Sequence, residues 1–149
     1  MDIIETDSFS ATGFLIRTTN ADEMNPSTAK IGNLWSKFYT DAAPKLNEKS
    51  KVYGLYTNYE SDVTGAFDVV ACSDTLSSEV LPEAVNVKVA SGKYVTFSAT
   101  GEMPQVVTDL WGEVWSYFSS ESCLYERAYT TDFEYYKSEN EVEISIAIK

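Results

Sequence analysis

The chain has 149 residues, of which 44% are apolar, and its 23 acidic and 11 basic residues give a formal charge of −12. The length and composition fit a single folded domain over 1–149. The acidic surface repels phosphate backbones, so direct nucleic-acid binding is not expected. No apolar run reaches the ~20 residues that cross a bilayer, and the acidic start, MDIIETDSFS, is unlike a secretory signal. We therefore expect a cytoplasmic protein without a membrane partner.

Histidine is absent from the sequence, and the two cysteines, Cys72 and Cys123, are far apart. Without histidine, Ser-His-Asp and Cys-His catalysis are impossible, and a typical zinc site is not expected. The sequence therefore predicts no metal and no cofactor, and the cysteines are expected to be free thiols. Any chemistry would use carboxylates, tyrosines, lysines or water. Aromatic residues make up 13% of the chain, a composition that favours a ligand pocket.

The first half of the chain predicts a strand, a helix and two further strands. Apolar residues at positions i, i+3, i+4 and i+7 indicate one face of the helix, and β-branched and aromatic residues indicate the strands. These elements are expected at FSATGFLIRTT (9–19), IGNLWSKF (31–38), KVYGLYTNYES (51–61) and GAFDVVACS (65–73).

The second half repeats this order. A long strand, kinked at its SG pair, is followed by a helix that has Pro104 in its first turn. Two closing strands then form a hairpin across SEN. These elements are expected at AVNVKVASGKYVTFSAT (84–100), after GEMPQ (101–105), at RAYTTDFEYYK (127–137) and at EVEISIAIK (141–149).

The two helices share an apolar stripe, and Tyr53 and Tyr129 match at the same offset. Any two amphipathic helices with a Leu-Trp pair look alike, but the shared order of elements favours a duplication. We therefore predict an α+β fold of duplicated β-α-β-β units, with pseudo-repeats over about 8–75 and 84–149. Side by side, these units make one wide antiparallel sheet with two main helices on one face. The matched helix residues are Ile31, Leu34, Trp35 and Phe38 in the first half and Val107, Leu110, Trp111 and Val114 in the second.

Several segments together resemble the GyrI-like small-molecule-binding family. They are YGLYTNYESD, ASGKYVTFSATG followed by LWGEVW, DFEYY and VEISIAIK. This family forms the effector-binding domain of some bacterial AraC-type and MerR-type regulators and also occurs free-standing. The resemblance implies a pseudo-twofold axis and a ligand groove on the helix-free face of the sheet. Because the first strand is expected to start near residue 8, with no room for a DNA-binding module, we expect a stand-alone member.

The resemblance also implies three alternative functions. Known members bind lipophilic, often cationic drugs around an acidic residue set among aromatics. Other members inhibit or protect DNA gyrase, so a protein partner such as gyrase or a separate regulator is an alternative. A further subgroup hydrolyses the cyclopropane ring of DNA-alkylating natural products. Binding of a small hydrophobic or cationic ligand is the function we favour, and the enzyme alternative stays open.

Strand alternation supplies the candidate site residues. It places Phe133 and Tyr135 toward the helices, and Glu134 and Tyr136 toward the expected groove. Glu143 and Asp68 are also predicted to face away from the helices. Glu134 is the favoured carboxylate, because it stands at the family's acidic position within an aromatic cluster. Burial among rings would raise its pKa, and a lipophilic cation would restore its charge.

The predicted ligand-binding residues combine these acids with nearby aromatic side chains. Glu134 and Tyr136 would be catalytic only in the enzyme alternative, in which a carboxyl positions water and a tyrosine donates a proton. Core packing is the simpler explanation for the tryptophans, since both lie on regular helical stripes. The full set is Glu134, Glu143, Tyr53, Tyr56, Tyr94, Phe97, Trp111 and Tyr136.

Overall fold

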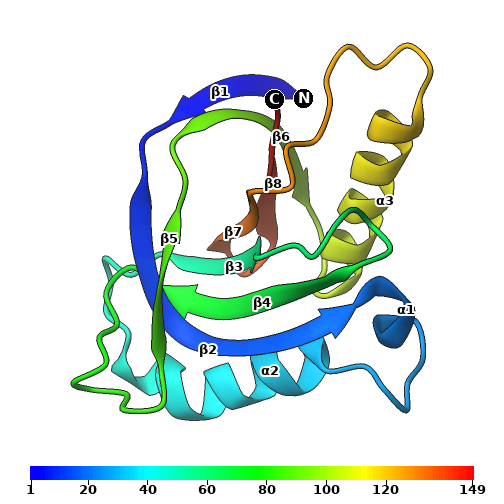
Figure 1. The fold of residues 1–149 in the computed structure, drawn as a ribbon. Helices are drawn as coiled ribbons and strands as arrows, with labels where there is room; N and C mark the ends of the chain where they lie inside the picture. Colours follow the sequence, from blue (N-terminus) through cyan, green and yellow to red (C-terminus); the bar gives the residue numbers. More distant parts are fainter.

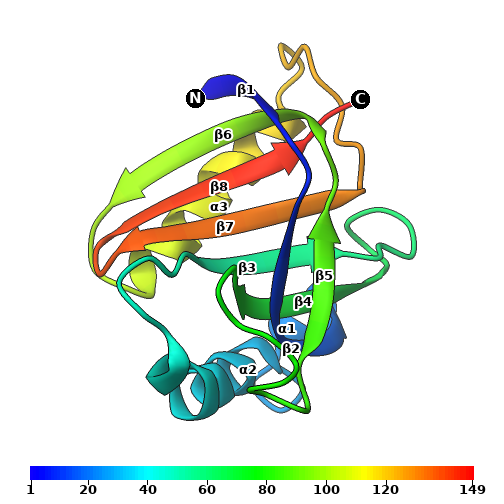
Figure 2. The same ribbon diagram turned by 90° about the vertical axis from the view of Figure 1, so that its left-hand side faces the viewer.

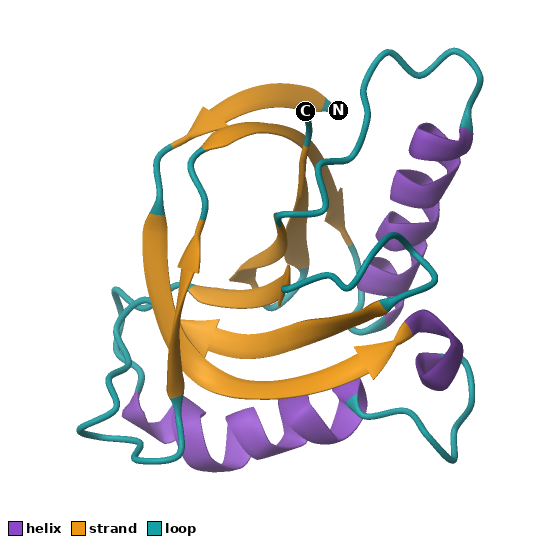
Figure 3. Ribbon diagram, viewed as in Figure 1, coloured by secondary structure: helices purple, strands orange, loops and turns teal.

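A computed structural model describes residues 1–149 as one eight-stranded antiparallel sheet that curls around its own interior, with the helices on its outer face (Figures 1 and 3). The strand order is β1-β6-β8-β7-β3-β4-β2-β5. The predicted α+β class with one wide antiparallel sheet is confirmed. The strands are β1 (Asp2–Thr6), β2 (Phe9–Thr19), β3 (Val52–Thr57), β4 (Ala66–Ser73), β5 (Val85–Val89), β6 (Gly92–Thr100), β7 (Thr131–Ser138) and β8 (Glu141–Ala147).

The two main helices lie where the apolar periodicity predicts them. They are α2 (Ile31–Lys37), which continues through a π turn and a 3-10 turn to Lys45, and α3 (Gln105–Ser119). The structure adds a short helix that was not predicted, α1 (Asn20–Glu23). The Glu23 carboxylate accepts the backbone N–H groups of Lys30 and Ile31, which satisfies free donors at the start of α2. The longest helix has 15 residues, and none combines the length and apolar character that spanning a membrane requires.

The element order repeats as predicted: β2-α2-β3-β4 is followed by β6-α3-β7-β8. If each strand is replaced by its equivalent in the other half, the strand order reads the same from the opposite edge of the sheet. The two halves meet at the centre of the sheet, where β3 pairs with β7. The structure adds a lead strand, β1, to the first half. The single long strand expected over 84–100 is wrong, because the chain breaks at Ala90–Ser91 into β5, the lead strand of the second half, and β6, which pair with different strands. These lead strands are exchanged: β1 pairs with β6 of the second half, and β5 pairs with β2 of the first half (Figure 2).

The register shows which residues of the two halves are equivalent. Gly54 of β3 faces Glu134 of β7 across the central pair, and this pair marks the pseudo-twofold axis. Tyr56 and Tyr136, each two residues further along its strand, are therefore equivalent. The predicted match of Tyr53 with Tyr129 is wrong, because Tyr129 precedes β7 and lies outside it. One row across the six inner strands reads Phe14, Ala71, Gly54, Glu134, Ile144 and Phe97.

Each main helix covers its own part of the outer face. Leu34 of α2 and Phe38 pack on Phe67, Val69 and Ala71 of the first half. In the second half, Leu110 and Val114 of α3 pack on β6 and β8. Burying these apolar side chains removes them from water, which is the main stabilising contribution to such a layer. The central strands of the outer face, between the two helices, are not covered by either helix.

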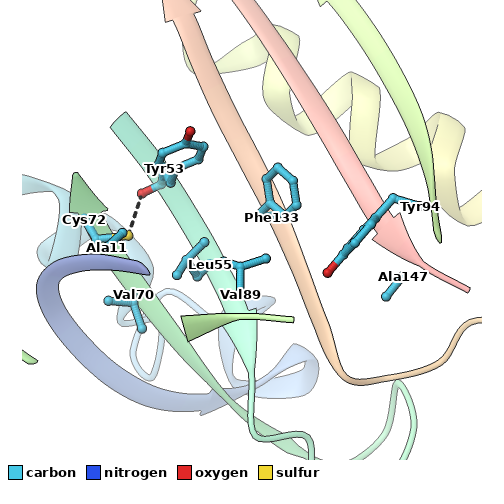
Figure 4. Packing of buried hydrophobic residues seen from close by; sticks show 9 residues of the cluster. All are labelled: Ala11, Tyr53, Leu55, Val70, Cys72, Val89, Tyr94, Phe133 and Ala147. Carbon is cyan, nitrogen blue, oxygen red and sulfur yellow. Dashed lines mark hydrogen bonds between the residues drawn. The ribbon is translucent and has the colours of Figure 1, made fainter. Parts of the chain in front are cut away.

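The inner face of the curled sheet is filled by the protein's own side chains (Figure 4). Its centre holds Leu55, Phe133 and Tyr94, and none of these is more than 8% exposed. The expectation of a ligand groove on the helix-free face is therefore wrong. The sheet curls enough for its inner side chains to meet, and this leaves both of its faces buried. The cluster is Ala11, Tyr53, Leu55, Val70, Cys72, Val89, Tyr94, Phe133 and Ala147.

Candidate functional site

A groove with a cavity of about 670 Å³ lies on the outer face, between α2 and α3. Trp35 of α2 and Tyr39 form one wall, and Val107 and Trp111 of α3 form the other. Its floor is the central strand pair, which contributes Tyr56, Glu134 and Tyr136. We call this cavity the Glu134 pocket.

Glu134 and Tyr136 thus share a face, as alternation predicts, but that face is the helix-covered one. Phe133 and Tyr135 were predicted to face the helices. They pack in the inner cluster instead. Glu134 pairs in register with Ile144, which packs under α3. The alternation was correct, but the choice of face was wrong, because the aromatic residues were assigned to the helix side.

Three neutral donors hold the Glu134 carboxylate. The indole Nε1 of Trp111 donates to Oε2 at 2.7 Å, and the Tyr56 hydroxyl donates to the same oxygen at 2.9 Å. The Tyr136 hydroxyl donates to Oε1 at 2.8 Å. The residue is only 2% exposed, so the protein has replaced almost all of its hydration by these bonds.

The electrostatics of this carboxylate are unbalanced, because it makes no salt bridge with lysine or arginine. Burial raises the pKa of Glu134 above its ordinary value, and the bonds from Trp111, Tyr136 and Tyr56 only partly oppose that rise. The same burial raises the pKa of Tyr56 and Tyr136, so both hydroxyls stay protonated as donors. The site is therefore an acceptor that lacks a positive partner.

Aromatic rings surround the carboxylate with the symmetry of the fold. Trp35 meets Tyr136 with ring centroids 5.2 Å apart and planes at 71°. Trp111 meets Tyr56 at 5.2 Å and 70°. Edge-to-face pairs of this kind hold rings in fixed orientations. The two halves thus supply matching walls around a single central acid.

Gly54 makes room for the acid at the centre. A Cβ built on Gly54 would lie closer to Glu134 Oε1 than van der Waals contact allows, and 3.1 Å from the Trp35 ring. Only a residue without a side chain leaves the carboxylate its place beside the axis. This gives the glycine in YGLYTNYESD a role that the sequence analysis did not assign.

The structure brings four of the predicted residues together, namely Glu134, Tyr56, Tyr136 and Trp111. The others lie elsewhere. Tyr53 and Tyr94 belong to the inner cluster, Phe97 packs under α3, Glu143 pairs with Lys137, and Asp68 pairs with Arg17.

The regular helical stripe predicts Trp35 as a core residue, and no sequence pattern assigns a role to Tyr39. Both line the Glu134 pocket. The repeated Leu-Trp pair was the available signal: if one tryptophan reaches the groove, its equivalent in the other half does too. No group of three or more Cys, Asp or Glu side chains is placed to hold a metal ion.

A curled sheet with external helices and an aromatic groove around a buried acid defines a small-molecule-binding domain. Residues 2–148 match the model of the family Cass2, the integron-associated effector binding proteins. The chain therefore belongs to this family, which is GyrI-like, as the resemblance predicts.

Individual proteins of known structure or sequence are similar to this chain. A crystal structure from the mobile metagenome of Vibrio cholerae, integron cassette protein VCH_CASS2, is 74% identical, covers 99% of this chain and 95% of its own, and has a TM-score of 0.96. YobU of Bacillus subtilis (strain 168), named as a transcriptional regulator protein, is 28% identical over 92% of this chain and 90% of its own. The structure of SAV2435 bound to tetraphenylphosphonium shares the fold at 20% identity, with a TM-score of 0.72 over 99% of this chain and 93% of its own.

Proposed function

We propose that this protein binds small amphipathic organic cations in the Glu134 pocket, with drug-like or genotoxic compounds as the ligand class. The observation that carries the proposal is a buried carboxylate without a positive partner, placed among four aromatic rings at the floor of an open groove. Binding would sequester such compounds or report their presence to a regulator.

The physical basis is the cost of the isolated charge. A buried carboxylate without a counter-ion is expensive, so a ligand cation at this site recovers electrostatic energy that the free protein lacks. Rings of Trp35, Trp111 and the two tyrosines offer cation–π contacts and apolar area in addition. The match to an effector-binding family supports this proposal, as does the tetraphenylphosphonium bound to SAV2435, which has the same fold.

Titration with tetraphenylphosphonium tests the proposal, since Trp35 and Trp111 both line the pocket and their fluorescence reports occupancy. Glu134→Gln keeps the shape and removes the charge. We expect its affinity to fall about 30-fold, which corresponds to about 2 kcal/mol of lost pairing.

Triphenylphosphine oxide, which has similar rings and no charge, is the matched control ligand. It should bind the wild type and Glu134→Gln equally, because it gains nothing from the carboxylate. Equal affinity of both proteins for the phosphonium would refute the role of Glu134.

A second candidate is the ring-opening hydrolase, which one observation favours. The Glu134 carboxyl group has a raised pKa and is hydrogen-bonded to two protonated tyrosine hydroxyls. Such a combination is suited to proton transfer. Incubation with a cyclopropane-bearing DNA alkylator and mass spectrometry of the products tests it. Ring-opened product that is absent with Glu134→Gln supports the hydrolase, and intact substrate removes it.

A further inference from the structure

A second cavity, of about 520 Å³, adjoins the Glu134 pocket along the same groove. The two cavities share the lining residues Ile31, Tyr56, Thr108 and Trp111. The Tyr56–Trp111 ring pair therefore lines both cavities and separates one from the other. We call the second compartment the Arg127 pocket.

The Arg127 pocket differs from its neighbour in having a basic residue in its lining, beside the acids Glu23 and Asp62. Phe67, Tyr59 and Trp115 give it apolar and aromatic walls, and Arg127 is the basic residue in its lining. The Arg127 side chain is only 11% exposed. A guanidinium in a largely apolar compartment is a strong donor site for an oxygen acceptor.

The guanidinium is only partly used by the protein. Its Nη2 donates to Asp132 at 2.7 Å, whereas Nε is buried and has no partner. Its Nη1 makes no hydrogen bond within the protein, although it is not among the sealed, unpaired atoms. The group lies over the Tyr129 ring at 4.6 Å, and Tyr129 holds an unusual φ of +53°. Strained residues of this kind gather at ligand sites.

Nearby acids do not satisfy these spare donors. Glu23 lines the pocket, but its oxygens accept from Thr18 and from the backbone at the start of α2. Asp62 accepts from the backbone and hydroxyl of Thr64. Nε is sealed inside the protein, so Nη1 is the donor of Arg127 that a ligand in the pocket can reach.

We propose that the two pockets form one bipartite site for an elongated amphiphile, whose organic cation lies at Glu134 and whose carboxylate or carbonyl oxygen reaches Arg127. This inference rests on the proposed function for its cationic end and adds a second recognition point, a guanidinium donor. It extends the ligand class from simple organic cations to dipolar or zwitterionic molecules long enough to pass the Tyr56–Trp111 partition.

The test compares two dyes that share one cationic ring system. Rhodamine 19 carries a free carboxylate, and rhodamine 6G carries its ethyl ester. Fluorescence anisotropy should show that Arg127→Gln weakens rhodamine 19 about tenfold and rhodamine 6G about threefold, because a charged acceptor gains more from the guanidinium. Tetraphenylphosphonium, which has no acceptor, should bind unchanged.

Two exposed helical glycines provide a matched pair that leaves Arg127 in place. Gly112 lines the Arg127 pocket and Gly32 lines the Glu134 pocket, and a Cβ at either position meets no atom within 4 Å. Gly112→Leu should weaken rhodamine 19 about tenfold and leave tetraphenylphosphonium unchanged, whereas Gly32→Leu should weaken both. This pair keeps the test decisive even if Arg127→Gln fails to fold.

The outcomes separate the two proposals. If tetraphenylphosphonium binds, but Arg127→Gln weakens both dyes equally and Gly112→Leu does not weaken rhodamine 19 more than tetraphenylphosphonium, the bipartite site is overturned and the proposed function stands. If tetraphenylphosphonium does not bind the wild type, both are overturned.

Discussion

Two buried carboxylates on β7 lie two residues apart and face the same side of the sheet, yet they are held in opposite ways. Asp132 is 0% exposed and pairs with Arg127, and it also accepts from the Tyr59 hydroxyl and the Ala147 backbone N–H. Glu134 is 2% exposed and has only neutral donors. One acid is charge-compensated within the fold, and the other is not.

This difference in charge compensation indicates a structural role for Asp132 and a ligand-binding role for Glu134. Burial raises the pKa of both acids, but only for Asp132 does an arginine oppose that rise. A compensated acid ties the segment before β7 to the end of β8 and contributes to stability. An uncompensated acid weakens the free protein and becomes favourable only when a ligand supplies the missing charge.

The largest expected effect tests this separation through stability. Asp132→Asn leaves Arg127 buried without its partner, and we expect it to lower the free energy of unfolding by about 3–5 kcal/mol. Glu134→Gln removes a charge that costs desolvation, so its change should stay within about 1 kcal/mol. Urea unfolding of the two variants measures both. Equal destabilisation would mean that Glu134 is as structural as Asp132.

Gly54→Ala sharpens the comparison by disturbing only one of the acids. Its Cβ would meet the Glu134 carboxylate and the Trp35 ring. Crowding a packed site in this way costs about 1–3 kcal/mol, and the displaced carboxylate should lose about tenfold in phosphonium affinity. Gly32→Ala, at an open helical position, is the control for stability and should not lower it. Unchanged phosphonium binding by Gly54→Ala would show that the position of the carboxylate does not matter.

A pH titration tests the unbalanced charge directly. Because burial raises the pKa of Glu134, its free form holds a proton over a range above the ordinary carboxyl pKa. A permanent cation binds the ionised form, so affinity should rise up to about tenfold per pH unit through that range and then level off. Tetraphenylphosphonium does not titrate, and Glu134→Gln should give a flat profile. A flat wild-type profile would contradict the raised pKa.

The smallest expected effect comes from a single donor. Tyr136→Phe removes one of the three hydrogen bonds to Glu134, so the charged form of the carboxylate is less stabilised. We therefore expect about a threefold loss of phosphonium affinity. Tyr53→Phe changes a tyrosine on the inner face and should have no effect. Calorimetric titration resolves the difference. Equal losses in both variants would indicate a general change in the sheet.

Much of the fold was predictable because it depends on local patterns. The 3.6-residue stripes from Ile31 and Val107 locate α2 and α3. The SG pair predicts only a kink, whereas the chain breaks there into the separate strands β5 and β6. The strand β1 was missed, because DIIET is short and two of its five residues, Asp2 and Glu5, are acidic. Its partner is β6, far along the chain, and no local pattern reveals such pairing.

The sequence predicted several residues of the site correctly, but it did not predict on which face of the sheet they lie. Alternation groups Glu134 with Tyr136 and separates them from Phe133, yet it does not say which group meets the helices. In β7 both faces are buried, so hydrophobicity gives no guide. Tyr53, Tyr94 and Glu143 lie on the side away from the helices, where the groove was expected, but Tyr53 and Tyr94 fill that side as core and Glu143 pairs with Lys137. The curl of the whole sheet decides the matter.

The Gly54–Glu134 pair at the pseudo-twofold axis bears on how this protein arose. An ancestral homodimer of one repeat would place the same residue on both sides of that axis. Two glutamates would crowd and repel each other there, and two glycines would provide no charge. Fusion of the copies into one chain allows the two positions to diverge, so that a single acid occupies space that its counterpart vacates. The asymmetry of this one pair therefore gives an otherwise symmetric site a single charge.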